Sequence, residues 1–324
     1  MHRSTHIHLI YLLLSTLATV WGCRKDKEEF HPYVPTQEDL GLLLSQAPDA
    51  SSHTVFQFGG SIPDTTLTTA SGVRVFLADT ENLFADDTGA PVPCSTCPNL
   101  KVEVTNVLSE GDLIARGMNT ESAADSKMLE SVGVVYLKVS CKGKPLALLP
   151  NRYVKVQIPA SDIKNSMHVF TGAFNDQDEW LGWTDTNSPA FWAEWPVPAP
   201  GTAQTGYEVI LPQLGWNNCA RPLTEQTSSF CVTLPDQFTA LNTRVFLVFE
   251  NVRAIAELKG TDNGSQFCFE EAPIGFTVDV VAISKTGGQY WVVRKPWETG
   301  NQVQLPLTPQ PVTEQEVLAV IKSL

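Results

Sequence analysis

Few side chains in this sequence are of the types that carry out catalysis. After the first 22 residues only three histidines remain. His31 lies in an irregular segment and His53 at the edge of a predicted strand, so a second group does not orient either one. His168 is best explained as a strand histidine with a satisfied hydrogen bond. The 35 acidic residues must include carboxylate pairs, but the sequence contains no nucleophile elbow, phosphate-binding glycine loop, dinucleotide fingerprint or His-Glu-x-x-His motif. We therefore predict that the protein is not an enzyme.

The richest group of potential metal ligands lies in the oxygen-rich run 175–179, Asn-Asp-Gln-Asp-Glu. Asp176, Asp178 and Glu179 could bind Ca²⁺, which takes six to eight oxygen ligands. The run lacks the glycine and the distal glutamate of an EF-hand loop. A polar turn between two strands is therefore the favoured interpretation, and no cofactor other than a covalent lipid is expected.

Four tryptophans follow this run, at Trp180, Trp183, Trp192 and Trp195. Aromatic faces stack on the apolar faces of sugars, so these rings could form a platform that binds glycans. A β-sandwich also fills its core with such rings, and this is the favoured interpretation, with two of the four left to face solvent.

The seven cysteines fall into one N-terminal residue and six others. The six are Cys94, Cys97, Cys141, Cys219, Cys231 and Cys268. Six thiols allow 15 pairings, and the spacing does not choose among them. The Cys94-x-x-Cys97 spacing could begin a zinc site, but a second such pair is missing. It could also be redox-active at a helix N-terminus, whereas here it lies in a loop flanked by prolines. We predict structural disulfides, as expected in an oxidising compartment.

The first 22 residues are typical of a secretory signal. Arg3 precedes an apolar stretch that is too short to span a membrane as a helix. The stretch ends at Val20-Trp21-Gly22-Cys23, which resembles a bacterial lipobox, although Trp21 is unusual there. We expect a covalent lipid such as palmitate on Cys23, with several acyl chains giving a stable anchor. A chance cysteine after an ordinary signal peptide is the alternative.

Charged residues follow Cys23 directly. Lys27-Glu28-Glu29 resembles the surface-export signal of lipoproteins in the Bacteroidota, and a solvated spacer explains the same residues equally well.

Composition points to a globular body with many strands. The 324 residues carry a net charge of −13, which argues against nucleic acid as a partner because phosphate binding needs clustered Lys and Arg. The length suggests two domains, although one large β-sandwich is compatible with it. With 22 prolines, 21 glycines and little helical periodicity, the chain is predicted to be all-β, with two β-sandwich-like modules and a short C-terminal helix.

Alternating apolar residues place strands at 73–77, 102–107, 132–139, 154–158 and 207–211, and later at 231–234, 244–250, 254–258 and 276–284. Residues 286–289 predict a hairpin turn, and Thr313 with Glu316 predicts a capping box at the C-terminal helix. Residues 188–205, rich in proline, are expected to form a loop or a linker. The predicted divisions are a tether at 23–51 with one short helix, modules at 52–218 and 219–310, and the helix at 311–324.

Several of these segments resemble ZU5-like β modules of Bacteroidota lipoproteins. The similar stretches in the first module are 71–73, 87–89, 129–133, 142–144, 154–156 and 214–221, and in the second 232–235 and 245–249. Ala220 departs from the pattern, since an acidic residue is usual there. His168 begins His-Val-Phe-Thr, which does not match the His-Phe-Ser autoproteolysis site of some ZU5-containing proteins. The resemblance covers roughly residues 55–310 and implies architecture and location rather than activity.

These features lead to one expected function and one alternative. We expect a lipoprotein of the outer membrane that faces the cell exterior and acts as a non-catalytic scaffold or accessory subunit for a partner protein of the membrane or cell surface. The alternative is a surface protein that binds glycans through the tryptophans of residues 180–195.

Overall fold

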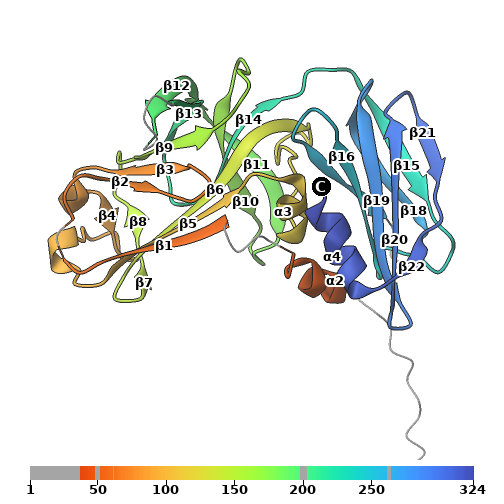
Figure 1. Cartoon of the computed structure of the whole chain (residues 1–324), viewed down its shortest axis with the longest axis horizontal. Helices are drawn as coiled ribbons and strands as arrows, with labels where there is room; N and C mark the ends of the chain where they lie inside the picture. The colour runs from red at the N-terminus through yellow and green to blue at the C-terminus, as the bar shows by residue number, and fades with distance from the viewer. Residues whose placement is uncertain (1–36, 48–51, 61, 198–202, 261–263) are drawn as a thin grey trace, which may run out of the picture. The chain divides into compact units, whose positions relative to one another are not determined.

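The structure is a computed structural model, and it describes residues 37–47, 52–60, 62–197, 203–260 and 264–324. The predicted signal peptide, the lipidation site Cys23 and the export signal Lys27, Glu28 and Glu29 lie outside these described residues. The described chain consists mainly of strands with a short C-terminal helix, which confirms the all-β prediction (Figure 1).

A seven-stranded and a five-stranded sheet are built from the first two thirds of the chain. The seven-stranded sheet has the order β1 (His53–Phe58), β5 (Leu100–Val107), β6 (Leu129–Cys141), β14 (Gly215–Pro222), β10 (His168–Phe174) and β11 (Trp180–Pro189), with β7 (Lys144–Pro145) paired to β6. The five-stranded sheet has the order β12 (Phe191–Pro196), β13 (Ala203–Leu211), β9 (Val154–Pro159), β3 (Arg74–Leu77) and β2 (Thr65–Thr68). A small pair joins β4 (Phe84–Ala85) to β8 (Ala147–Leu148).

An eight-stranded sheet is built from the remaining third. Its order is β21 (Val303–Pro306), β15 (Thr227–Thr233), β18 (Gln266–Pro273), β17 (Ile255–Gly260), β16 (Thr243–Phe249), β19 (Thr277–Thr286), β20 (Gln289–Glu298) and β22 (Gln310–Val312). The helices are α2 (Gln37–Leu44), α3 (Glu110–Ala115) and α4 (Glu314–Lys322), and two 3₁₀ turns are η2 (Thr80–Asn82) and η3 (Cys94–Thr96).

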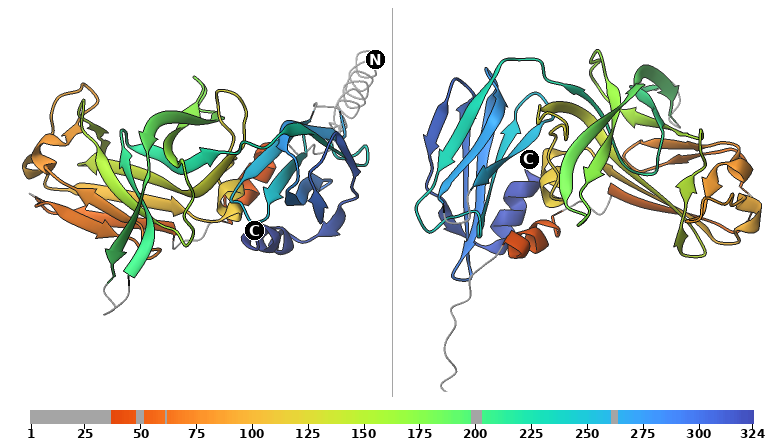
Figure 2. Two further views of the ribbon diagram at one scale, coloured as in Figure 1. Left: turned by 90° about the horizontal axis from the view of Figure 1, so that it is seen from above. Right: turned by 180° about the vertical axis from the view of Figure 1, so that it is seen from behind.

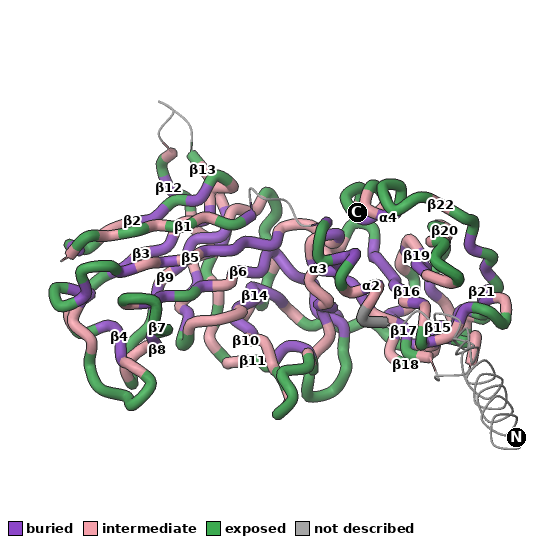
Figure 3. Tube along the Cα trace, turned by 90° about the horizontal axis from the view of Figure 1, so that it is seen from below, coloured by how far each residue is buried: buried purple, intermediate pink, exposed green. Residues whose placement is uncertain are grey.

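Two cores follow from the alternation of side chains along the strands. The seven- and five-stranded sheets share one apolar cluster, in which Leu137 of β6 lies with Val156 of β9 and Val209 of β13. A second cluster, which includes Val245 and Leu247 of β16, lies within the eight-stranded sheet. In both cases successive residues point to opposite faces, so one face of each strand supplies the core. Figure 3 shows the resulting burial along β5, β6 and β14.

A third cluster joins helices to strands of both the seven- and the eight-stranded sheets. Phe246 and Val248 of β16 point away from the core of their own sheet and into this cluster, together with Val134 of β6 and Trp183 of β11. Strand β16 is thus buried on both faces, which explains why its sequence is a continuous apolar run. The described residues all belong to one compact unit.

The helices fill this third cluster closely. Val317 and Ile321 of α4 are buried, and the predicted capping box of Thr313 and Glu316 is present. A Cβ atom on Gly111 of α3 would lie 2.0 Å from the carbonyl oxygen of Ile321, so only glycine permits this approach. Figure 2 shows α2 beside α4, with which it is in contact.

Helix α2 corrects the predicted extent of the tether. Its residues Leu40, Leu43 and Leu44 are almost completely buried in the third cluster. The segment 37–47 therefore belongs to the folded body rather than to a tether that ends at residue 51. The short helix itself was predicted, but its partners lie in β16, β19 and α4, far away in the sequence.

Other predicted elements are confirmed or corrected. The hairpin at 286–289 is confirmed, because Thr286 pairs with Gln289 across two glycines with positive φ. Strand β12 lies inside the predicted loop 188–205, because Pro189 precedes the strand, Pro196 ends it and the other prolines follow it. The boundary placed between residues 218 and 219 falls inside β14, all of which belongs to the seven-stranded sheet. Helix α3, which begins after the cap Ser109, was not predicted.

The six cysteines in the described part of the chain form two disulfides. Cys97 is bonded to Cys141 at the end of β6, and Cys231 is bonded to Cys268, its direct cross-strand neighbour. Cys94 and Cys219 are free and buried, so the prediction that all six pair is corrected. Burial raises the pKa of both free thiols. Since Cys97 is oxidised, the Cys94-x-x-Cys97 spacing offers no thiolate pair for zinc.

The role of α2 in the core gives a stability prediction. Leu40→Ala should lower the free energy of unfolding by about 3 kcal/mol, because it removes buried side-chain volume from the third cluster. Leu42→Ala, at a side chain that is 63% exposed on the same helix, is the matched control and should change it by less than about 0.5 kcal/mol. Urea unfolding of both variants measures the difference. Equal changes in the free energy of unfolding for the two variants would show that α2 belongs to the tether and not to the core.

Candidate functional site

The four predicted tryptophans are distributed over two sheets rather than gathered on one surface. Trp180 and Trp183 lie on β11, and Trp192 and Trp195 on β12. Trp183 and Trp195 are buried, which confirms the core interpretation for these two rings. Trp192 is half-buried and packs edge-on against Tyr207 at 5.2 Å between ring centroids. Trp180 is also half-buried, and unlike Trp192 it lines the cavity described below.

The oxygen-rich run 175–179 forms the turn between β10 and β11. Asn175 Oδ1 accepts hydrogen bonds from the backbone N–H groups of Gln177 and Glu179, each at 2.9 Å, and Asn175 Nδ2 donates to Glu179 Oε2. Asp178 has a φ of 60°, as expected in a tight turn. The described residues contain no group of three or more His, Cys, Asp or Glu side chains that could hold a metal ion. The polar turn favoured for the run with Asp176, Asp178 and Glu179 is confirmed, and the calcium alternative gains no further ligand among the described residues.

The two described histidines have local partners. His168 Nδ1 lies 3.2 Å from Asp185 Oδ2, and His53 Nδ1 lies 2.9 Å from Thr105 Oγ1. Both histidines lie at the start of a strand and are held by neighbouring strands, as a structural role requires.

A cavity of about 520 Å³ lies beside Trp180. Trp180 comes from the start of β11, whereas the other walls come from the eight-stranded sheet: Arg244 from β16, Glu257 and Lys259 from β17, and Phe267 from β18. The indole Nε1 of Trp180 donates to Asn119 Oδ1 at 3.0 Å, which fixes the ring. The cavity therefore combines a rigid aromatic wall with charged groups.

An ion network holds the charged wall. Arg244 donates from Nε and one Nη to the two oxygens of Glu257, at 2.8 and 2.9 Å, and Lys259 Nζ lies 3.3 Å from the same carboxylate. Burial raises the pKa of Glu257, but the charge and hydrogen bonds of Arg244 outweigh it and leave the pKa below its usual value. Glu257 is consequently a fixed anion and no proton donor near neutral pH.

A second carboxyl group, Glu121, lies behind Trp180. Asn119 Nδ2 donates to Glu121 Oε1 at 2.7 Å, and the backbone N–H of Glu257 approaches the same oxygen at 3.4 Å. Burial raises the pKa of Glu121 to about 7, and the negative charge of Glu257 contributes to this shift. Hydrogen bonds thus connect Trp180 to a carboxyl group that changes its charge near neutral pH.

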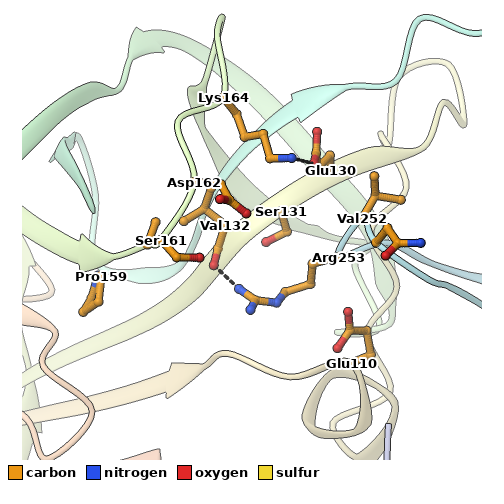
Figure 4. Close-up of a pocket in the computed structure, with 12 residues that line it drawn as sticks. Glu110, Glu130, Ser131, Val132, Pro159, Ser161, Asp162, Lys164, Val252 and Arg253 are labelled. Carbon is orange, nitrogen blue, oxygen red and sulfur yellow. Dashed lines mark hydrogen bonds and ion pairs between the residues drawn. The ribbon is translucent and has the colours of Figure 1, made fainter. Parts of the chain in front are cut away.

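A second cavity, of about 270 Å³, is shown in Figure 4. Glu130 of β6 is buried there between two cations, with Lys164 Nζ at 3.1 Å from Oε1 and Arg221 Nε at 2.6 Å from Oε2. Ser131 Oγ, next in the chain, donates to Asn218 Oδ1 at 2.6 Å. The guanidinium of Arg253, from the loop between β16 and β17, enters the same cavity and donates to the carbonyl oxygen of Val132.

Glu179, a calcium candidate from the sequence, lines the cavity beside Trp180, but the other charged residues of the two cavities were not predicted. A weak signal existed for Glu257, which interrupts the apolar strand at 254–258, and for Glu130, which lies between Leu129 and the apolar run of β6. A charge in such a run indicates a buried partner. For Glu121 and Arg253 the neighbouring sequence carries no comparable signal, because Glu257 and Val132, with which they make hydrogen bonds, lie more than a hundred residues away.

The chain matches no protein-family model and no curated protein sequence. Among its described residues, no helix is both long and apolar enough to span a membrane.

The pKa of Glu121 predicts a dependence of stability on pH. Its folded-state pKa of about 7 lies above the ordinary value of 4.5, so the folded state is favoured below pH 4.5 and loses stability as the pH rises towards 7. Glu121→Gln, which resembles the protonated acid, should leave stability unchanged at pH 4 and raise the free energy of unfolding by about 3 kcal/mol at pH 8.

Urea unfolding at both pH values measures this effect. Glu194→Gln, at an exposed position of β12, is the control and should show no such dependence. An equal gain for Glu121→Gln at both pH values would contradict the assignment.

Proposed function

We propose that this protein is an outer-membrane lipoprotein that is anchored through acyl chains on Cys23 and faces the cell exterior. Its folded body would bind a partner protein of the membrane or cell surface without catalysis. The signal-like residues 1–22, the lipobox-like residues before Cys23 and the export-like Lys27, Glu28 and Glu29 support this location. The resemblance to ZU5-like modules of Bacteroidota lipoproteins supports it as well.

One observation carries the choice of binding over catalysis. In each of the two cavities described above, one lining carboxylate is already held by two cations: Glu130 by Lys164 and Arg221, and Glu257 by Arg244 and Lys259. Glu121, whose pKa is about 7, does not line the cavity beside Trp180. General acid–base catalysis needs a carboxyl group that exchanges a proton with its substrate. Carboxylates fixed in this way instead maintain the shape and the charge pattern of a recognition surface.

The lipid anchor can be tested by counting thiols. Four of the seven cysteines are in disulfides, so the denatured, unreduced mature protein should expose Cys94 and Cys219 alone if a thioether blocks Cys23. We expect two reactive thiols by iodoacetamide labelling and mass spectrometry, and a lipidated N-terminal peptide. Cys23→Ala should move the protein from the membrane to the soluble fraction. A third thiol, or unchanged membrane partitioning of the variant, would contradict the anchor.

The partner can be tested by chemical crosslinking on intact cells followed by mild detergent extraction. A specific outer-membrane or surface protein should be crosslinked to the wild type at native expression. Cys23→Ala is the control, since it keeps the body intact but removes it from the membrane. Recovery of an uncrosslinked monomer alone would argue against the scaffold role.

A second candidate function is glycan binding at the cavity beside Trp180. The observation in its favour is the combination of one fixed indole with charged hydrogen-bonding groups of Arg244, Glu257 and Lys259. Sugars are recognised by such a pairing of an aromatic face with polar groups around the ring.

Retention on polysaccharide gels tests this candidate. Trp180→Ala and Lys259→Ala should each reduce retention about tenfold, because both side chains line the cavity. Lys259 is 71% exposed, so its replacement should leave the fold intact. Trp192→Ala, which removes a half-buried ring outside the cavity, is the matched control. If Trp180→Ala and Trp192→Ala reduce retention equally, the loss reflects reduced stability of the fold. If neither Trp180→Ala nor Lys259→Ala reduces retention, this cavity does not bind a glycan.

A further inference from the structure

Arg253 occupies an unusual position in the cavity of Figure 4. Its backbone is fixed, because its carbonyl oxygen accepts a hydrogen bond from Ser131 N at 2.9 Å and the neighbouring Ala254 carbonyl accepts one from Phe249 N. One Nη donates to Val132 O. The Nε–H is buried and has no hydrogen-bond partner among the described residues. A rigid loop thus holds the guanidinium in the lining of the cavity, with one Nη donating to Val132 O and Nε shielded in the wall without a partner.

Such an arrangement is costly unless something occupies it. A buried donor on a charged group loses its water on folding, and the loss is recovered only when a partner accepts its hydrogen bond. Burial accordingly lowers the pKa of Arg253. Buried groups of this kind call for a specific explanation, such as a bound water or a ligand.

The acidic side chains of the same cavity do not pair with this guanidinium. Both oxygens of Glu130 are engaged by Lys164 and Arg221. Glu110, in the first turn of α3, faces Arg253 and acts on it through its charge, with no hydrogen bond between them in the described structure. Asp162 is exposed on the loop after β9. No carboxylate of the described residues accepts two parallel hydrogen bonds from the Arg253 guanidinium, which is the pairing that this planar group forms best.

We propose that this cavity binds one carboxylate group of the partner protein, with Arg253 as its donor. The inference rests on the proposed function. The volume of about 270 Å³ accommodates a carboxylate with a short stem, and Ser161 lines the same space, whereas the Ser131 hydroxyl already donates to Asn218. A carboxylate fits better than a phosphate, because Glu110 and Asp162 would repel a second negative charge.

Blocked pentapeptides in solution provide the test, with purified full-length protein and NMR titration. One peptide carries glutamate between glycines, the second carries glutamine instead, and the third is pentaglycine with a free C-terminal carboxylate. We expect the glutamate peptide or the free C-terminus to bind, and comparison of these two shows whether the partner supplies a side chain or its terminus. The glutamine peptide should bind at least tenfold more weakly.

Variants of the two facing residues complete the test. Arg253→Lys keeps the charge but removes the fork, and we expect at least a tenfold increase in Kd. Glu110→Gln removes the opposing charge and should tighten binding severalfold, an outcome that loss of folding cannot imitate. Binding of the glutamine peptide as tight as that of the tighter-binding carboxylate peptide, no binding of any peptide, or an unchanged Kd in both variants would overturn the proposal. Crosslinking to a partner on intact cells is measured separately, so a failure here leaves the proposed function intact.

Discussion

A small set of hydrogen bonds between two distant segments determines where both cavities lie. Thr120 donates its backbone N–H to Ile255 O at 2.9 Å and accepts from Ile255 N through Oγ1, and Ser131 N donates to Arg253 O. These bonds join the residues leading into β6 to the start of β17. On one side of this junction lies the cavity that contains Arg253, and on the other side lie Glu121 and Glu257. Without the junction, neither set of charged groups would face its partners.

The apolar packing beneath the junction explains why it is rigid. Strand β16 contributes Val245 and Leu247 to the core of its own sheet, and Phe246 and Val248 to the cluster shared with the helices and β11. A strand buried on both faces cannot shift its register without exposing one apolar set. The ion pair of Arg244 with Glu257 therefore projects from two strands whose positions packing already fixes.

Local features of the fold could be predicted from the sequence because short-range physics determines them. The Thr286–Gln289 turn needs two residues with positive φ and has two glycines, and the capping box needs only Thr313 and Glu316. Strand β12 was missed because proline was taken to end regular structure, whereas the strand stops at Pro196. The cavities could not be predicted, since burial of Glu121 and Arg253 depends on contacts across more than a hundred residues. The disulfide pairing could not be predicted for the same reason. The sequence does not distinguish among 15 pairings of six cysteines, and only the folded sheets bring the two bonded pairs together.

The packing of α2 against α4 has a consequence for how the chain reaches its native state. Helix α2 is the first described element and α4 the last, and Leu40 and Ile321 share one core. A polypeptide emerging from the ribosome or from a translocation channel cannot close that core until its final turn has emerged. Long-range closure of this kind slows the formation of this cluster and delays it until synthesis is complete. The buried leucines of α2 therefore lack their packing partners in α4 until the C-terminus has been made.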